Sequence, residues 1–543
     1  TELLNDLGEA VTLNSSDELI TINGELNKRF SLDFEIAAIS ESVVAESNMS
    51  SSETSDETSS ADASDVEDVV VTGTRFGVSQ YKSSQPITII TADDIRVQGY
   101  TNAASAVFDL PSVFASASTA GDQSGLVAGQ RIANNFGLGS GRTLTLVDGK
   151  RFISSQSIQG GSAATGSVDL NNIPLTLIKR IEVQSSGGSA MYGSDAIAGV
   201  INFVLDDISE GGSLSYKMGE YTEGDGATTT IAGKYGMPLG QDGFVTTSFQ
   251  IRQADDTSRS VQRPDAAALI AGGNTSVATP AQIWGAPKID DDVTFFLNSG
   301  VTNSDGSESY AFGNYSERDV DGGFYYRNPD GRSGVFTIGD YRAVGNVDGT
   351  CAYGTGASGQ VDPSNYATRD AIMADPSCFL MNEIAPGGYT PRFVGTITDT
   401  SLTMGRRGDI TDGFLSGHTY DVSGSVGRNE ADFGLNNTVN PSMGPDTPRN
   451  FYTGSYIELE KTFNFDLTRQ VDSMTIAYGA EWREETFEVI SGEEASWKAG
   501  KYALQGFNVG SHGFAGFSPD SQGAFTRRSY DSLTEFKVND TWV

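Results

Sequence analysis

Few residues of this 543-residue chain have the types and spacing that catalysis or metal binding requires. The chain has only two histidines, His418 and His512, and two cysteines, Cys351 and Cys378. No histidine lies near the cysteine pair in the sequence, so a metal site built on these two thiolates is poorly supported. No Ser/His/Asp or Cys/His arrangement for nucleophilic catalysis can be drawn either. We therefore predict that the protein is not an enzyme and uses no cofactor or metal.

A glycine-rich segment, residues 134–142, has a spacing that could suggest a loop for binding phosphate groups. Such loops follow a strand and open a helix, and a Lys-Ser or Lys-Thr pair follows their glycines. Here the glycines precede a predicted strand, residues 143–147, and no such pair follows them. The order of elements therefore disfavours a nucleotide site. Asp148-Gly149, directly after this strand, predicts a hairpin turn instead.

The balance of charge limits the classes of partner. The 71 Asp and Glu outnumber the 35 Lys and Arg, and the formal net charge is −36. Nucleic acid binding needs clustered positive charge, so we exclude a nucleic acid partner. Acidic side chains are densest in residues 1–68, where only Lys28 and Arg29 are basic. The 64 glycines and the frequent aromatic residues favour many short strands joined by turns. No run of ~18 apolar residues predicts a transmembrane helix.

Residues 178–205 are the stretch around which we interpret the rest of the chain. Two β-prone runs, residues 181–183 and 200–205, flank a segment rich in Gly, Ser and Ala. We therefore predict a strand, a tight loop, one short helical turn at residues 195–198 and a second strand.

Further strands and helices are predicted upstream of this stretch. Residues 86–91 are typical of a strand. Thr91 and Asp94 predict a capped helix start, and residues 102–110 predict a second helix that Pro111 ends.

Residues 173–202 closely resemble the end of the plug domain of TonB-dependent outer-membrane receptors. The resemblance rests on the runs Ile173-Pro174, Arg180-Ile181-Glu182-Val183, Tyr192-Gly193-Ser194-Asp195-Ala196-Ile197 and Gly199-Val200-Ile201-Asn202. The glycine-rich loop, the strand and the Asp-Gly turn also occur in the order of that family. The chain departs from the family at Phe136, where an arginine is common, and at residues 184–186.

The resemblance implies a structural or gating role for a set of signature residues. They are Gly137, Gly139, Arg142, Asp148, Gly149, Arg180, Glu182, Tyr192, Gly193, Asp195, Gly199 and Asn202. The family places Arg180 and Glu182 between plug and barrel wall, which favours a structural role for them over ligand contact.

A short β-branched run, Asp68, Val69, Val70, Val71 and Thr72, ends the acidic leader. An extended segment of this kind suits addition to the edge of a partner's sheet. It resembles the TonB box, which implies TonB, in the energised inner-membrane complex, as a partner. The alternative is the first strand of the next domain, and a conditionally docked strand would serve both roles. Within the leader, residues 28–47 look like a signal-peptide remnant, but acidic residues interrupt it.

After Leu205 the sequence alternates between apolar and polar residues with period two. One apolar and one polar face suit a membrane barrel with lipid outside and water inside, but also a large soluble sandwich or propeller. The plug resemblance favours the barrel. Aromatic residues near predicted strand ends are consistent with interfacial girdles: Tyr221, Tyr235, Tyr315, Tyr456 and Trp482. We count roughly 11 to 13 strands against the 22 of plugged transporters. The chain also opens on Thr1, and its last residues resemble a strand. With the strand count, these features lead us to expect a fragment.

Two long polar stretches, residues 254–292 and 331–388, separate predicted strands, and loops of that length are usually functional. On an outer-membrane barrel they would face outwards and bind the ligand. Cys351 and Cys378 share the second stretch, and in an exported protein such a pair indicates a disulfide. The scarcity of histidine disfavours a haem ligand.

These observations predict a mostly β chain: a small α+β plug followed by an antiparallel transmembrane β-barrel of the plugged 22-stranded type. The expected domains are a largely disordered acidic leader (1–67), a TonB box (68–75), a plug (76–205) and the first part of the barrel (206–543). The resemblance implies active import of a scarce nutrient ligand of unknown identity across the bacterial outer membrane. Outer-membrane lipid and lipopolysaccharide are the further partners expected. The alternative is a surface binding protein or adhesin anchored by a barrel, without transport.

Overall fold

The computed structural model describes residues 86–100, 102–117, 129–155, 167–185, 188–283, 285–354, 360–471 and 474–529, and three short strands in the leader. The leader strands are β1 (Glu2–Leu4), β2 (Ala10–Thr12) and β3 (Phe30–Ile36). The predicted TonB box, residues 68–75, lies outside the described residues. Residues 30–36, expected in an unstructured leader, form β3 instead, because apolar residues alternate there with period two and suit pairing with a neighbouring strand.

The small domain, residues 86–205, is built on a five-stranded sheet in the order β4-β9-β10-β7-β8. β10 runs parallel to β7, and the other neighbours are antiparallel. Two helices and a two-stranded sheet, β5-β6, complete the domain. The element bounds are β4 (Ile87–Thr91), α1 (Ala92–Val97), α2 (Ala103–Phe108), β5 (Val113–Ala117), β6 (Ile132–Asn135), β7 (Thr143–Val147), β8 (Lys150–Arg151), β9 (Ile178–Gln184), α3 (Ser189–Tyr192) and β10 (Gly199–Leu205).

The predicted helix starts and the predicted hairpin are confirmed. The Thr91 side chain accepts from the backbone N–H of Asp94, and the Asp94 carboxylate accepts from the N–H of Thr91, which completes a reciprocal cap. Asn102 caps α2. Asp148 (φ 46°) and Gly149 (φ 76°) both have positive φ and join β7 to β8, as two-residue turns between antiparallel strands require.

The helical turn predicted at residues 195–198 is wrong: the short helix is α3, six residues earlier. Gly193 (φ 72°) and Asp195 (φ 73°) are in left-handed conformations that cannot continue a right-handed helix. The glycine ends α3, and the chain then turns so that Asp195 is buried.

The large sheet has eleven strands in the order β24-β23-β22-β21-β20-β15-β14-β13-β12-β11-β3, each antiparallel to its neighbours. Ten of these strands, all within the described residues, follow Leu205. Their bounds are β11 (Gly211–Gly219), β12 (Thr228–Pro238), β13 (Gly243–Ala254), β14 (Lys288–Thr302), β15 (Glu308–Gly323), β20 (Arg392–Ile410), β21 (His418–Asn436), β22 (Phe451–Val471), β23 (Met474–Ser491) and β24 (Gly523–Ser529).

The two faces of the large sheet have the polarity of a membrane barrel. In β13, Phe249 and Ile251 are 39% and 43% exposed, whereas the polar residues that alternate with them, Ser248, Gln250 and Arg252, are buried. A soluble sandwich or propeller would bury the apolar face, so this pattern decides between the architectures that alternation left open. Exposed apolar side chains continue on neighbouring strands: Leu214, Met218, Phe295, Leu402, Met404, Val426 and Phe463.

The predicted aromatic girdle is only partly correct. Tyr221 and Tyr235 are exposed and lie near the ends of β11 and β12. Tyr315 and Trp482 lie near the middle of their strands. Tyr456 stacks on Phe517, its ring centroid 4.8 Å away. Alternation does not mark where a strand ends, and the observed strands continue on both sides of these rings.

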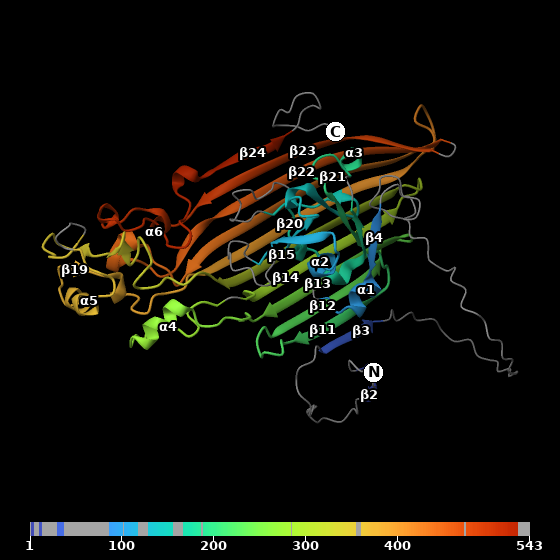
Figure 1. Cartoon of the computed structure of the whole chain (residues 1–543). Coiled ribbons are helices and arrows are strands. Elements are labelled where there is room, and N and C mark those ends of the chain that lie inside the picture. Colours follow the sequence, from blue (N-terminus) through green and yellow to red (C-terminus); the bar gives the residue numbers. More distant parts are fainter. Residues whose placement is uncertain are drawn as a thin grey trace.

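Short turns and long connections lie at opposite ends of the large sheet. The connections 239–242, 303–307, 411–417 and 472–473 are short, whereas 255–287, 324–391, 437–450 and 492–522 are long. In outer-membrane barrels short turns face the periplasm and long loops the exterior. Figure 1 shows α4, α5, β19 and α6 gathered at the long-loop end, and the small domain against the sheet. No helix among the described residues is long and apolar enough to cross a membrane.

The long loops fold into a cap with its own apolar core. The core joins residues of three loops: Val335, Phe336, Ala343, Phe379, Met381, Ala385, Tyr389, Val439, Tyr502 and Phe507. The loop elements are α4 (Pro264–Ala271), β16 (Thr337–Ile338), β17 (Tyr341–Arg342), β18 (Gly345–Asn346), α5 (Tyr366–Met373), β19 (Cys378–Phe379) and α6 (Glu494–Trp497).

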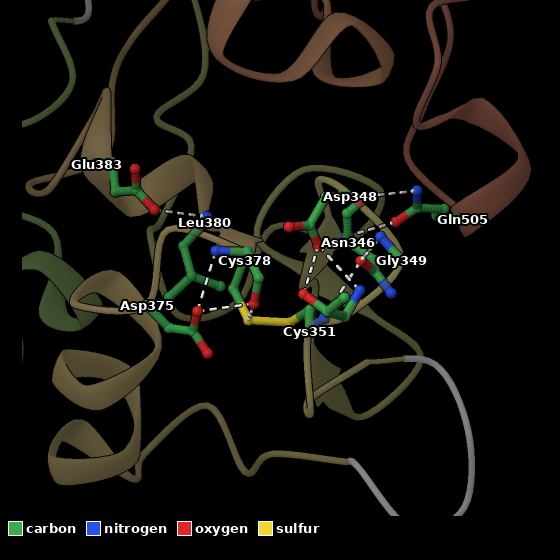
Figure 2. The surroundings of a disulfide bond; sticks show 11 residues. Asn346, Asp348, Gly349, Cys351, Asp375, Cys378, Leu380, Glu383 and Gln505 are labelled. Atoms are coloured by element: carbon green, nitrogen blue, oxygen red, sulfur yellow. Dashed lines mark hydrogen bonds between the residues drawn. A yellow bond between two sulfur atoms is a disulfide. The ribbon is translucent and has the colours of Figure 1, made fainter.

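A disulfide between Cys351 and Cys378 closes part of the cap (Figure 2). Beside it, the backbone N–H of Asn346 donates to the Gln505 side chain at 2.7 Å, which ties this loop to the one after β23. The cap is therefore cross-linked both covalently and by hydrogen bonds.

Candidate functional site

The candidate functional site is the contact between the small domain and the inner, polar face of the large sheet. One of its central groups is the buried carboxylate of Asp195, in the turn before β10. One oxygen of Asp195 lies 3.2 Å from Arg151 Nη1 in the small domain and 3.0 Å from Arg483 Nη1 on β23. A single carboxylate therefore joins a cation of the small domain to a cation of the large sheet. We call the large sheet the wall from here on.

Further carboxylates of the wall surround the same two arginines. Arg483 lies 3.5 Å from Glu460 on β22 and also contacts Glu485. Arg151 Nε lies 3.4 Å from Glu481. Buried charges are tolerated only when they are paired and hydrogen-bonded, and here each arginine has more than one anionic partner.

A second buried ionic cluster lies against β13–β15. Arg318 of β15 donates through both terminal nitrogens to one oxygen of Asp169, each at 2.8 Å. Its Nε lies 3.8 Å from Asp292, which also lies 3.9 Å from Arg252. Burial, with Arg252 nearby, lowers the pKa of Arg131 in the small domain to about 10. The wall thus contacts the domain through charged groups here as well as around Asp195.

Several signature residues pair with one another inside the small domain. Arg180 Nε lies 2.8 Å from Glu182, and the Asn202 side-chain amide donates to Glu182 at 3.1 Å. Asn202 also accepts from the N–H of Gly149 at 2.9 Å. Asp148 accepts from the N–H of Leu205 at 2.9 Å, and burial raises the pKa of this carboxyl to about 7. These contacts hold the Asp-Gly turn against β9 and β10.

The other signature residues shape the backbone of the small domain. Gly137 and Gly139 have φ of 67° and 109°, and Arg142 donates to the Leu138 carbonyl at 2.7 Å, outside the interface. Tyr192 packs in a small apolar cluster with residues of β7. Gly199 has φ 142°, and a Cβ there would lie 2.3 Å from the Gln184 carbonyl oxygen.

A cavity of about 610 Å³ lies between the small domain and the wall at the short-turn end of the sheet. Its lining is mostly polar and includes Asp148, Lys150, Glu308, Arg407 and Asp421. Lys150 crosses from the domain to the wall, with its Nζ 3.1 Å from Asp421. The interface is therefore loosely packed on this side.

Sequence reasoning missed the residues that join the two parts. Arg151, Asp169, Arg318 and Arg483 were not among the predicted site residues. The usable signal was a charged residue at a polar position within an alternating strand, as for the two wall arginines. The predicted TonB-binding residues 68–72 lie outside the described residues. The described residues contain no group of three or more His, Cys, Asp or Glu suited to holding a metal.

Comparison with known proteins gives one family match and several structural ones. Residues 79–200 match the family model of the TonB-dependent receptor plug domain. A variant of the ferric enterobactin receptor PfeA from Pseudomonas aeruginosa is similar at 16% identity with a TM-score of 0.49, over 84% of this chain and 55% of that one.

Two further solved structures are similar at lower identity. The siderophore receptor PiuA from Acinetobacter baumannii gives 11% identity and a TM-score of 0.45, over 78% of this chain and 61% of that one. The unliganded ferric citrate transporter FecA gives 12% and 0.43, over 76% and 57%. The chain therefore spans little more than half the length of the receptors it matches.

Proposed function

The chain contains a TonB-dependent receptor plug domain followed by strands of an outer-membrane β-barrel, and on that premise we propose that it serves active import of a scarce nutrient ligand. Energy would arrive from the inner membrane through TonB, bound at residues 68–72. The proposed division is a leader (1–67), a TonB box (68–75), a plug (76–205) and barrel strands (206–543). Lipid and lipopolysaccharide would contact the exposed apolar face.

The observation that carries the proposal is the ionic contact between plug and wall. Inside the plug, apolar side chains form a continuous core that includes Leu170, Ile181 and Phe203, and on one side this core extends to Phe296 of β14 and Phe312 of β15. Elsewhere along the wall, the contacts include ion pairs, such as Asp195 with Arg483 and Lys150 with Asp421. Water can replace ionic partners, but it cannot replace apolar packing without a cost of about 25 cal/mol per Å². Separation of the whole plug would therefore cost most at the apolar contact with β14 and β15 and less at the ion pairs, and a plug that yields one strand at a time would not have to break all of these contacts at once.

The position of β4 supports the second route. β4 is the edge strand of the plug sheet and pairs only with β9 among the described strands. It is the first plug strand after the predicted box, residues 68–75, so a pull on the box would load β4 before the other plug strands. Because its hydrogen bonds lie one after another along the strand, they can break in sequence, which requires less force than simultaneous rupture.

The alternative is a surface binding protein or adhesin in which the barrel is an anchor. Such a protein needs neither a plug that can be displaced nor a TonB-binding segment. If a receptor that cannot bind TonB kept its full biological activity towards the ligand, that result would favour this alternative.

The test is deletion of residues 68–72 from the full-length receptor in its own outer membrane. We expect ligand binding at the cell surface to persist and uptake of radiolabelled ligand to stop. The matched control deletes five residues of the acidic leader, 55–59, and should leave both unchanged. Unchanged uptake after the box deletion would refute the proposed transport role.

A further inference from the structure

The extracellular cap contains arginines that have no carboxylate partner, in a chain with twice as many acidic as basic residues. Most arginines of the described residues face a carboxylate, as Arg342 faces Asp330 at 3.0 Å and Arg369 faces Asp370 at 2.7 Å. Arg327, Arg332 and Arg449 form no ion pair in the described part of the chain. The first two lie in the loop after β15, and the third lies in the loop after β21. We call these three the cap arginines.

The cap arginines converge on one pair of rings, Tyr389 and His512. Arg332 Nε donates to His512 Nε2 at 3.2 Å, and the Tyr389 hydroxyl lies 3.3 Å from His512 Nδ1. The Arg449 guanidinium stacks over the Tyr389 ring, 5.3 Å from its centroid. The backbone of Arg327 pairs with that of Tyr389. Two loops therefore bring the three arginines close to Tyr389 and to His512, which a third loop supplies.

Among the described residues no carboxylate compensates the positive charge of this cluster, and the side chain to which Arg449 Nη2 donates, at 2.6 Å, is the neutral Asn437 amide. Arg327 is only 4% exposed, its Nε has no hydrogen-bond partner, and its guanidinium rests on the ring of Phe324. Burial lowers the pKa of Arg327 to about 10, and burial together with Arg327 and Arg332 lowers that of His512 to about 3. At neutral pH the histidine is thus neutral and accepts a hydrogen bond, while the arginines remain charged.

A buried cation without a partner is costly, so this arrangement reduces the stability of the cap unless an anion completes it. Arg332 is exposed and Arg449 is half-buried, which leaves the cluster open to solvent on one side. Guanidinium groups bind carboxylate and phosphate with paired, charge-assisted hydrogen bonds. Tyr389 belongs to the apolar core of the cap, so the rings that hold the arginines are fixed.

We propose that Arg327, Arg332 and Arg449 form a binding site for a carboxylate or phosphate group of the imported ligand, so that the receptor selects an anionic substrate. This inference rests on the proposed function. The same chemistry exists in the phosphates of lipopolysaccharide, which surround the outer ends of such barrels. The burial of Arg327, Tyr389 and His512 inside the cap favours a soluble ligand over a lipid headgroup.

The test uses the full-length receptor, purified in detergent and freed of lipopolysaccharide. The probes are inorganic phosphate and propane-1,2,3-tricarboxylate, with a neutral trisaccharide as the uncharged control, all measured by calorimetry. The variant Arg332→Gln/Arg449→Gln removes the two accessible charges and leaves the buried Arg327 in place. Arg369→Gln is the matched control, because Arg369 also stacks on a cap tyrosine, Tyr366, but has its own carboxylate.

We expect the wild-type receptor to bind at least one anion and not the trisaccharide. The double variant should bind that anion at least tenfold more weakly, and R369Q should stay within twofold of wild type. A non-reducing gel reports the Cys351–Cys378 bond and so checks that the cap of each variant has folded. Absence of anion binding by the wild type at millimolar probe, or equal binding by the double variant, would overturn the proposal.

A second arm separates the two sources of phosphate. Lipid A is added in mixed micelles, and its binding is compared between wild type and the double variant. Binding of lipid A alone, lost in the double variant, would assign the site to the membrane and overturn the substrate proposal. Import that continues without any anion binding would refute the anionic substrate but leave the transport function intact. Loss of import on deleting residues 68–72 tests the transport function independently.

Discussion

Replacement of Asp195 by asparagine should loosen the plug from the barrel wall. Asparagine has the same shape and tolerates the left-handed backbone of this position, φ 73°. The change removes the negative charge that Arg151 and Arg483 share at 3.2 and 3.0 Å. It therefore tests the electrostatic link without removing packing volume.

The size of the effect follows from the partners that remain. Removing one member of a buried ion pair costs about 3–5 kcal/mol when the other is left alone. Here Arg483 keeps Glu460 and Glu485, and Arg151 keeps Glu481. We therefore expect about 2 kcal/mol, on the scale of one or two hydrogen bonds to a charged group. That is about a 30-fold rise in the population of the separated plug.

Hydrogen exchange of the plug in the full-length receptor measures this population. Amides of β8 and β10 should exchange about 30-fold faster in D195N. The control is Asp207→Asn, because Asp207 pairs with Lys179 at 2.7 Å with both side chains about half exposed. Such a surface pair contributes under about 1 kcal/mol. Equal exchange in wild type and D195N, or an equally large effect of D207N, would refute the reasoning.

Three further predictions concern the plug and the cap. Cysteines replacing Thr88 and Val183, which lie opposite each other on β4 and β9, should form a disulfide that stops uptake but not ligand binding, with uptake restored by a reductant. Serine in place of Cys351 should remove the disulfide to Cys378, 27 residues away, and so lower the stability of the cap by about 3–4 kcal/mol. Proteolysis of the cap should then be faster, and an unchanged cleavage rate would contradict the prediction. Gly199→Ala should lower the yield of folded receptor, measured by heat-modifiable gel mobility, because its Cβ would collide with a β9 carbonyl oxygen 2.3 Å away.

Local features of the plug could be read from the sequence because they depend on neighbouring residues. The Thr91–Asp94 cap and the Asp148-Gly149 turn each form within a few residues, so the residue types suffice to predict them. The short helix was misplaced because residues 189–192 (Ser-Ala-Met-Tyr) and 195–198 (Asp-Ala-Ile-Ala) are both compatible with one helical turn. Only the left-handed backbone at Asp195, which serves a partner on β23, decides between them.

Period-two alternation specified strands but not which face meets water or lipid. Only the tertiary structure shows that Phe249 is exposed and Ser248 is buried. The same alternation would fit a sheet whose apolar face is buried and whose polar face is exposed. Alternation does not mark where a strand begins or ends either. Tyr315 and Trp482 therefore appeared to lie near strand ends when they lie near strand centres.

The sequence by itself determined the plug, its turns and the alternating strands, because these arise from contacts within a short stretch of chain. The tertiary structure alone decided which charges meet. Asp195 and Arg483 are 288 residues apart, and Arg332 and His512 are 180 apart. No local propensity encodes such pairs. They follow from the order and register of many strands, which place distant residues on one wall or in one cap.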